Sequence, residues 1–375
     1  MAACLIVQPW FTAIGHPAQS TLNTAKALGR RADLGYLISD PRGGPFEPIA
    51  AELSRYGDVT RFRVPSDSLR AGTLLGLAAL LRHRRLCADL RSVLFADAYL
   101  VAVAALWPLA SRLLPTVRAL GVVYLQGPEH LASKPVRRRL LSRFFGAPGR
   151  RLFLRTEELA CAWRAAFPDI PPGRIDTLPT LEIADGAGIE TPPAAHDGPP
   201  RFAVIGQVRP GKSLEWLVPL FRANPGLGTL RVAGAFHNAA HRERLETLRG
   251  YPHFDDRVLG EREMLAAASE QDYLVALYDD WDPRMEVATV FLGARVGRPV
   301  LVYDAGWAGR VVSEYGCGVA VPATPRPDAA FFASLPRPGQ AAYGALLAGV
   351  RRFRDAHGGP ASRDLFVAKL VAEPR

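Results

Sequence analysis

The feature that most constrains the fold of this 375-residue chain is an alternation of short apolar runs with longer segments of helical periodicity. In the N-terminal half the expected strands are Cys4–Gln8, Leu34–Ile38, Val59–Val64, Ser92–Phe95, Gly121–Leu125 and Arg151–Leu154, and the expected helices are Ser20–Leu28, Leu69–Arg82, Leu100–Leu113 and Pro135–Phe145. Strands and helices in this alternation predict a parallel, doubly wound sheet.

The same alternation restarts after residue 200. The expected strands are Phe202–Ile205, Thr229–Ala233, Arg257–Leu259, Tyr273–Ala276 and Val300–Tyr303, and the expected helices are Ser213–Phe221, Ala239–Leu248, Glu261–Ala268, Glu286–Arg295 and a final helical region. Residues 184–200 are rich in Pro, Gly and Ala without apolar periodicity, which is typical of a solvated linker. We therefore expect an α/β protein with two doubly wound, Rossmann-like domains, at 1–183 and 201–375. Whether the last helix packs back on the first domain stays open.

Composition narrows the class of protein further. Hydrophobic residues make up 49% of the chain, enough for two cores and too many for wholesale disorder. The longest apolar stretch, Leu69–Leu81, is shorter than the ~20 residues that cross a bilayer as a helix. The four cysteines lie far apart without metal-type spacing, so we expect reduced thiols, no metal site and no cofactor. Without a basic segment before its first apolar run, the N-terminus does not resemble a signal peptide, and a cytoplasmic protein is predicted.

The formal net charge of +10 favours anionic partners. Nucleic acid is not expected among them, because no RNA-binding signature, zinc motif or helix-turn-helix context surrounds the basic segments.

The ends of the predicted strands carry the candidate site residues, because ligands of open parallel sheets bind beyond the carboxyl ends of the strands. After the first C-terminal strand comes a loop that runs from Gly206 to Glu215 and carries Arg209 and Lys212 before a helix. Backbone N–H groups at a helix N-terminus and two cations suit a phosphate. An ordinary strand-to-helix turn with surface cations would show the same composition.

A second constellation spans Tyr273 to Glu286, where a strand is followed by an acidic loop and a helix start. The carboxylate of Glu286 is suited to accept hydrogen bonds from a ribose diol, and it would equally be stabilised by the helix dipole. Small residues then recur between Ala294 and Val319, where they allow the backbone to approach a ligand closely.

Together, Ile205–Leu214, Leu230–Gly234, Tyr273–Glu286 and Ala294–Val319 resemble the C-terminal half of GT-B glycosyltransferases of family 4 in order, spacing and residue types. The resemblance covers roughly residues 200–322, and the N-terminal half shares only the architecture.

It implies a nucleotide-sugar donor on the C-terminal domain, an acceptor on the N-terminal domain, and metal-independent transfer between them with retention of anomeric configuration. Lys212 matches the residue that neutralises the donor diphosphate, and Glu286 matches the ribose-binding Glu of the family's Glu, seven residues, Glu motif. Gly206, Gly234, Gly297 and Pro299 match structural positions.

Two positions depart from the family pattern. Gln207 stands where the family has a phosphate-binding Arg, and Tyr278 stands where the first Glu of the motif contacts the donor sugar. Arg209 is a candidate for the missing cation, and Asp280 or Asp282 for the missing carboxylate, although both acids also suit a solvated loop.

Acceptor-binding candidates follow strands of the N-terminal half. They are Gly15 and His16 after the first strand, Asp97 after the strand at Ser92–Phe95, and Gln126 and His130 after the next strand. An acid in the position of Asp97 is suited to orient or deprotonate a hydroxyl, or to cap the following helix. His16 has the alternative of packing against its own loop.

A basic amphipathic helix is predicted after Lys134, where Arg137, Arg138, Arg139 and Arg143 alternate with Leu and Phe and no acid occurs up to Arg155. Such a helix is suited to dock on an anionic membrane surface, and it also suits a solvated face over an apolar core. Most of the excess positive charge lies in the N-terminal half, which would suit a lipid-linked acceptor at the inner face of the cell membrane.

The sequence thus predicts a glycosyltransferase of cell-surface or exopolysaccharide synthesis, with a saccharide or lipid-linked acceptor and no committed catalytic base. Two alternatives remain. One is a sugar-nucleotide epimerase of the same fold, whose acid and base set is not found here. The other is a non-catalytic scaffold partner, which Gln207 and Tyr278 would favour.

Overall fold

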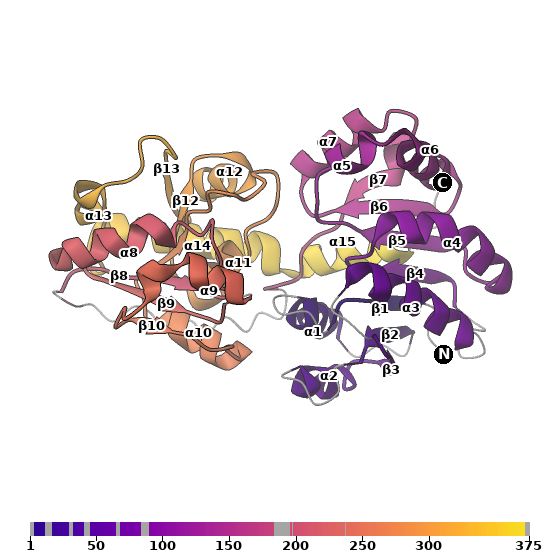
Figure 1. The fold of residues 1–375 in the computed structure, drawn as a ribbon, viewed down its shortest axis with the longest axis horizontal. Coiled ribbons are helices and arrows are strands. Elements are labelled where there is room, and N and C mark those ends of the chain that lie inside the picture. Colours follow the sequence, from indigo (N-terminus) through magenta and orange to yellow (C-terminus); the bar gives the residue numbers. More distant parts are fainter. Residues whose placement is uncertain are drawn as a thin grey trace. The chain divides into compact units, whose positions relative to one another are not determined.

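The structure, a computed structural model, describes residues 4–11, 17–29, 33–40, 46–64, 68–83, 90–183, 196, 198–236 and 238–371. It divides into two compact units, one of Met1–Ala184 with Pro360–Arg375 and one of Asp185–Gly359. Each unit is built on one parallel sheet with helices between successive strands (Figure 1), so the predicted doubly wound α/β class is confirmed.

The first unit holds a seven-stranded sheet in the order β3-β2-β1-β4-β5-β6-β7. Its strands are β1 (Cys4–Gln8), β2 (Leu34–Ser39), β3 (Asp58–Phe62), β4 (Ser92–Phe95), β5 (Ala119–Val123), β6 (Arg150–Leu154) and β7 (Ile175–Thr177). Its helices are α1 (Pro17–Leu28), α2 (Glu47–Leu53), α3 (Leu69–Arg82), α4 (Leu100–Leu113), α5 (Glu129–Ala132), α6 (Pro135–Gly146), α7 (Glu157–Ala166) and α15 (Pro360–Val371), with a 3-10 turn at Pro172–Arg174.

The second unit holds a six-stranded sheet in the order β10-β9-β8-β11-β12-β13. Its strands are β8 (Arg201–Ile205), β9 (Thr229–Ala233), β10 (Phe254–Asp255), β11 (Tyr273–Ala276), β12 (Val300–Tyr303) and β13 (Gly318–Val321). Its helices are α8 (Leu214–Ala223), α9 (Ala239–Arg244), α10 (Glu261–Ser269), α11 (Ala288–Val296), α12 (Gly306–Tyr315), α13 (Ala329–Ser334) and α14 (Ala341–Gly358), with 3-10 turns at Pro225–Leu227 and Glu246–Leu248.

The central strands read as continuous apolar runs because helices cover both of their faces. In β11 and β12 every residue is buried, and the ring of Phe202 in β8 stacks on Tyr273 in β11 with centroids 5.6 Å apart. Burial of this kind removes apolar surface from water along the middle of each sheet. The core therefore fixes the strands whose ends carry the candidate site.

Some expected elements differ from the structure. The strand expected at Arg257–Leu259 is wrong, because the edge strand is β10, where Phe254 pairs with Val232 of β9. Arg257 instead turns its guanidinium to Asp255 and to Glu263 of α10. The helix expected at Ala239–Leu248 ends at Arg244 and continues as a 3-10 turn. Helices α2, α5, α7, α12 and strands β7, β13 were not among the expected elements.

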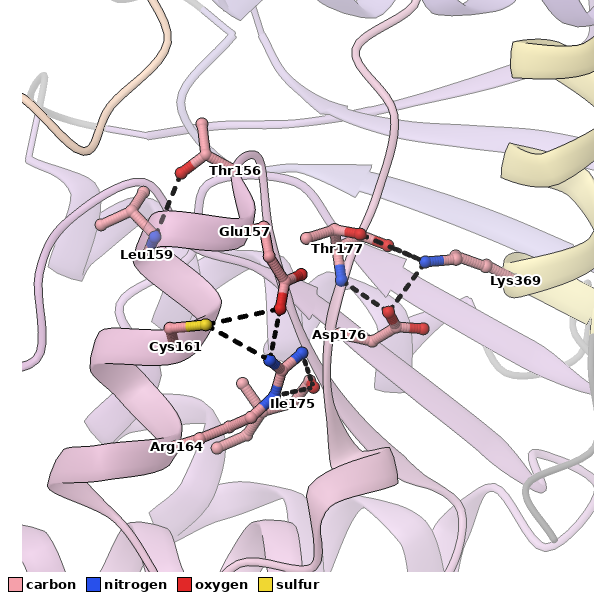
Figure 2. A network of polar contacts seen from close by, with 9 residues as sticks. All are labelled: Thr156, Glu157, Leu159, Cys161, Arg164, Ile175, Asp176, Thr177 and Lys369. Atoms are coloured by element: carbon pink, nitrogen blue, oxygen red, sulfur yellow. Dashed lines mark hydrogen bonds and ion pairs between the residues drawn. The ribbon is translucent and has the colours of Figure 1, made fainter. Parts of the chain in front are cut away.

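The last helix, α15, lies with the first unit although its sequence follows the second (Figure 1). Figure 2 shows Lys369 of α15 reaching the edge strand β7, where its Nζ lies 2.8 Å from Asp176 Oδ1 and 2.6 Å from the Thr177 carbonyl oxygen. In the same view Arg164 of α7 bonds Glu157 and the Ile175 carbonyl. Hydrogen bonds from side chains of α7 and α15 thus stabilise the short edge strand β7.

The order of strands reverses at one point in each sheet, between β1 and β4 in the first unit and between β8 and β11 in the second. Loops that leave two neighbouring strands in opposite directions open a crevice at such a point, and ligands of doubly wound sheets bind there. The loops after β8 and β11 are the ones that the sequence singled out.

Candidate functional site

The loop between β8 and α8 bends sharply back over the end of its sheet. Gly206 and Gly211 have φ of +96° and +81°, and Ser213, which directly precedes α8, also adopts the left-handed region at +57°. Positive φ costs little for glycine and more for serine, so Ser213 needs support from its surroundings. Its Oγ lies 3.1 Å from the hydroxyl of Tyr303, which in turn donates to Asp279 Oδ1 at 2.8 Å.

The loop after β11 is tied to the loop after β8 by its backbone. The amide of Asp279 donates to the Gly211 carbonyl at 2.8 Å. The ends of β8 and β9 also approach closely, since a Cβ at Gly234 would lie 2.0 Å from the Gly206 carbonyl oxygen. The three strand ends therefore hold the loop in one conformation around Lys212.

Lys212 is buried, with only 7% of its surface exposed. Its Nζ donates a long hydrogen bond of 3.4 Å to the Ile205 carbonyl and lies 5.5 Å from the centre of the Tyr278 ring. No carboxylate among the described residues pairs with it. Burial, and then the nearby charge of Arg209, lower the pKa of Lys212 to about 7. A cation with so little compensation is suited to receive an anion.

Arg209 lies beside two aromatic rings of the loop after β11. Its guanidinium carbon is 5.4 Å from the centre of the Trp281 ring and 5.9 Å from that of Tyr278. Its Nη1 donates to both oxygens of Asp280, at 2.7 and 2.9 Å. The structure thus brings together Arg209 and Asp280, the two residues that the sequence offered separately as replacements for missing groups.

Tyr278 lies near both cations, with its ring centre 5.9 Å from the Arg209 guanidinium carbon and 5.5 Å from Lys212 Nζ. Its hydroxyl lies 2.9 Å from Thr289 Oγ1 of α11. Burial raises the pKa of Tyr278 despite the opposing effects of Thr289 and Arg209, so the side chain stays neutral. The ring supplies an apolar, π-rich wall where a carboxylate would have supplied charge.

The remaining candidates of this loop lie further along. Asp282 forms a two-point ion pair with Arg284, at 2.9 and 2.7 Å, and this partner lowers the pKa of its carboxyl. Glu286 is half-buried and precedes α11, which begins at Ala288, so the expectation that Glu286 stands in the opening turn is wrong.

Gln207 is half-buried in the loop after β8.

A second cluster lies at the carboxyl end of β5 in the first unit. The hydroxyl of Tyr124 donates to Gln126 Oε1 at 3.2 Å and lies 3.1 Å from His130 Nε2. The indole of Trp163 donates to the Gln126 carbonyl at 3.0 Å and packs edge-on against Tyr124. The structure therefore joins Gln126 and His130 through a tyrosine that sequence reasoning missed. Its signal was an aromatic hydroxyl directly after a buried strand, since β5 ends at Val123.

Asp97 lies at the end of β4, half-buried and with φ of +57°. It does not cap the following helix, because the N-cap of α4 is Tyr99. Gly15 and His16 lie outside the described residues.

The four arginines of the predicted basic helix lie on α6. Arg138, Arg139 and Arg143 are exposed, Arg137 is half-buried, and Leu141, Phe144 and Phe145 form the buried side. The neighbouring α4 packs against α6 and exposes Leu106, Leu109 and Leu113 by 40%, 60% and 44%. A one-sided apolar stripe thus lies beside exposed positive charge.

The described residues contain no cluster of His, Cys, Asp and Glu that could hold a metal ion. None of their helices is long and apolar enough to cross a membrane.

Comparison with solved structures then relates this architecture to known proteins. HepE of Anabaena, in its complex with UDP-glucose, superposes with a TM-score of 0.68 at 11% identity over 98% of each chain. A glycosyltransferase from Rickettsia africae superposes with a TM-score of 0.64 at 11% identity, over 96% of this chain and 95% of that one. This chain has the GT-B fold.

The GT-B fold also serves other chemistry. A UDP-GlcNAc 2-epimerase from Neisseria meningitidis superposes with a TM-score of 0.50 at 13% identity, over 93% of this chain and 97% of that one. No known protein-family profile matches the sequence, and no curated protein resembles it closely enough to match. At such identities similarity establishes the fold alone, and the activity has to be argued from the site.

Proposed function

We propose that the chain is a glycosyltransferase, similar to family 4, that transfers a sugar from a nucleotide donor to a saccharide or lipid-linked acceptor. The observation that carries this proposal is the buried, poorly compensated cation of Lys212 at the β8/β11 switch point. Helix α8 begins two residues later, at Leu214, so amide groups of the loop and of the helix N-terminus lie near the same position. A diphosphate would satisfy all of these donors.

The donor we propose is a UDP-sugar, because HepE has the same fold and binds UDP and UDP-glucose. Gly206 and Gly234 would let the nucleotide approach the strand ends closely, and Glu286 would accept hydrogen bonds from the ribose. Gln207, Tyr278, Asp280 and Asp282 would border the diphosphate and the sugar.

During transfer, negative charge grows on the departing diphosphate. Lys212 and Arg209 would stabilise it as charges already in position before the reaction begins, which is electrostatic preorganisation and would need no metal. The acceptor hydroxyl attacks the anomeric carbon, and in a retaining reaction the departing phosphate oxygen takes its proton. No side chain is required as the base.

The acceptor would be held by the first unit. Tyr124, Gln126 and His130 present hydrogen-bonding groups, which suit sugar hydroxyls, and Asp97 adds a carboxylate at the end of β4. Gly15 and His16 are proposed to complete this site from the sequence pattern alone.

We further propose that the first unit docks peripherally on the inner face of the cell membrane. The support is the combination on α4 and α6: leucine side chains for the headgroup boundary, and Arg138, Arg139 and Arg143 for anionic lipid. A lipid-linked acceptor of cell-surface polysaccharide synthesis would be presented there.

The test of the donor site is thermal-shift screening of UDP-, GDP-, ADP- and dTDP-sugars, since a ligand that binds only the native state stabilises it by about 2.7 kcal/mol at 100 times its Kd. We expect a UDP-sugar to stabilise the wild type and Glu286→Ala to lose most of that shift. Glu270→Gln is the matched control, because Glu270 pairs with Arg231 outside the site.

Thermal-shift screening and an assay of donor turnover, with and without acceptor, together separate the three candidate functions. A transferase releases UDP only when acceptor is present, whereas an epimerase converts the donor without acceptor. A scaffold that has lost its donor site, as Gln207 and Tyr278 would favour, shows no shift with any nucleotide.

The test of membrane docking is co-sedimentation with vesicles that contain roughly 30 mol% anionic lipid. On such a surface each nearby basic residue contributes about 1 kcal/mol to the binding free energy. Arg138→Ala with Arg139→Ala should lower the partition coefficient about tenfold or more, and Leu109→Ser should lower it independently. Arg262→Ala with Arg351→Ala removes two exposed charges from the second unit as the control. Equal losses in both double variants would contradict docking through α4 and α6.

A further inference from the structure

An internal carboxylate already lies on the loop that we assign to the donor diphosphate. Both oxygens of Asp280 accept from Arg209 Nη1, at 2.7 and 2.9 Å. The same carboxyl group lies against Gly211, where an added Cβ would be 2.1 Å from its carbon. Asp280 therefore occupies the loop surface one residue before Lys212, and only a glycine leaves room for it.

Arg209 has contacts other than the one with Asp280. Its side chain is 17% exposed and lies beside the Trp281 and Tyr278 rings, which favour a cation over their faces. Gln207 provides no charge, so Arg209 is the arginine that the loop offers to a phosphate. In the structure that arginine is paired with Asp280.

We propose that Asp280 is an internal competitor of the nucleoside diphosphate: it pairs with Arg209 in the empty site and is displaced when the diphosphate binds. This inference rests on the proposed function. Asp280 can leave at low cost, because its side chain is 54% exposed and water can replace its partner. When the product nucleoside diphosphate departs, Asp280 returns to Arg209, which accelerates product release.

The competing assignment, that Asp280 binds the donor sugar in place of the acid missing at position 278, predicts the opposite sign. If Asp280 competes with the diphosphate, its neutralisation tightens binding of UDP, which has no sugar. If it binds the sugar, neutralisation leaves UDP affinity unchanged and weakens UDP-glucose.

The experiment is isothermal titration of UDP and UDP-glucose into the full chain. We expect Asp280→Asn to bind UDP about fivefold more tightly than the wild type, the ratio that corresponds to loss of an exposed ion pair. Glu270→Gln removes the carboxylate of an ion pair of similar exposure, Arg231–Glu270, and should leave the affinity unchanged. In the Arg209→Ala background, Asp280→Asn should give no gain.

Each other result overturns the inference in a distinguishable way. Unchanged UDP affinity in Asp280→Asn would show that the Arg209–Asp280 pair has no effect on binding of the diphosphate. A gain that persists without Arg209 makes the effect a general change of charge. If the wild type binds neither UDP nor UDP-glucose, the proposed UDP-sugar donor fails and this inference with it, whereas wild-type binding without the fivefold gain overturns the inference alone.

Discussion

The carboxyl ends of the two sheets differ in the kind of polar group that they hold. In the second unit a buried lysine and an arginine lie among aromatic rings, with the one carboxylate that pairs with Arg209 largely exposed. In the first unit the hydroxyl of Tyr124 joins the neutral Gln126 to His130. The same architecture thus presents charge at one edge and neutral hydrogen bonds at the other, which suits a diphosphate and sugar hydroxyls respectively.

The contrast between the two sheet edges is tested most strongly by Lys212→Met, which keeps the apolar stem and removes the charge. We expect donor affinity and transfer to fall by at least about 100-fold, since an ion pair with a buried cation is lost. Titration calorimetry and an assay of UDP release measure both effects. If the donor still bound with near wild-type affinity, the charged edge would have no role in binding it.

The same substitution should stabilise the empty protein by about 1–3 kcal/mol at pH 7, because a lysine that folding takes from its ordinary pKa to about 7 is an unfavourable buried charge. The unfolded chain binds more protons between pH 7 and 10.5, so the wild type gains stability as pH rises through that window. The advantage of Lys212→Met in denaturant melts should therefore be largest below pH 7 and decline toward pH 10.5.

The affinity for the donor should also depend on pH. Only charged Lys212 attracts the diphosphate, and its pKa is about 7, so affinity for UDP-glucose should fall about tenfold from pH 6 to pH 8. UDP-glucose is the suitable ligand, because it lacks a terminal phosphate that would itself titrate near pH 6.

Binding should raise the pKa of Lys212, so proton uptake should appear as a dependence of the binding enthalpy on the ionisation heat of the buffer. Lys212→Arg keeps its charge throughout this range, and any donor binding that it retains should not vary with pH. A wild-type affinity that is flat between pH 6 and 8 would contradict the assignment of Lys212 to the phosphate.

The sequence predicted what local apolar patterns determine. The strand Cys4–Gln8 and the helices Leu69–Arg82 and Leu100–Leu113 have the bounds that their periodicity indicated, because each buries its own continuous apolar side. The two-residue β10 did not stand out, since such a short edge strand depends on β9 for its conformation. The Arg209–Asp280 pair joins residues 71 positions apart, and the choice of Asp280 rather than Asp282 follows from loop geometry that no spacing rule contains.

The neutral edge has its own test in Tyr124→Phe, which removes one hydroxyl from the centre of the cluster. That hydroxyl donates to Gln126 Oε1, and its oxygen lies 3.1 Å from Nε2 of His130. Loss of one such hydrogen bond costs about 1 kcal/mol, and we expect KM for the acceptor to rise about fivefold. UDP affinity should stay at the wild-type value, because the change lies in the other unit.

Tyr36→Phe is the matched control, since Tyr36 is a fully buried tyrosine of β2 in the same sheet and its hydroxyl has no hydrogen-bond partner among the described residues. A rise in KM with both variants would show a general loosening of the first unit and no positioning of Gln126 and His130. A change in the pH profile of kcat/KM that occurs only in Tyr124→Phe would place His130 in contact with the acceptor, because only there does its ring lose the hydroxyl beside Nε2.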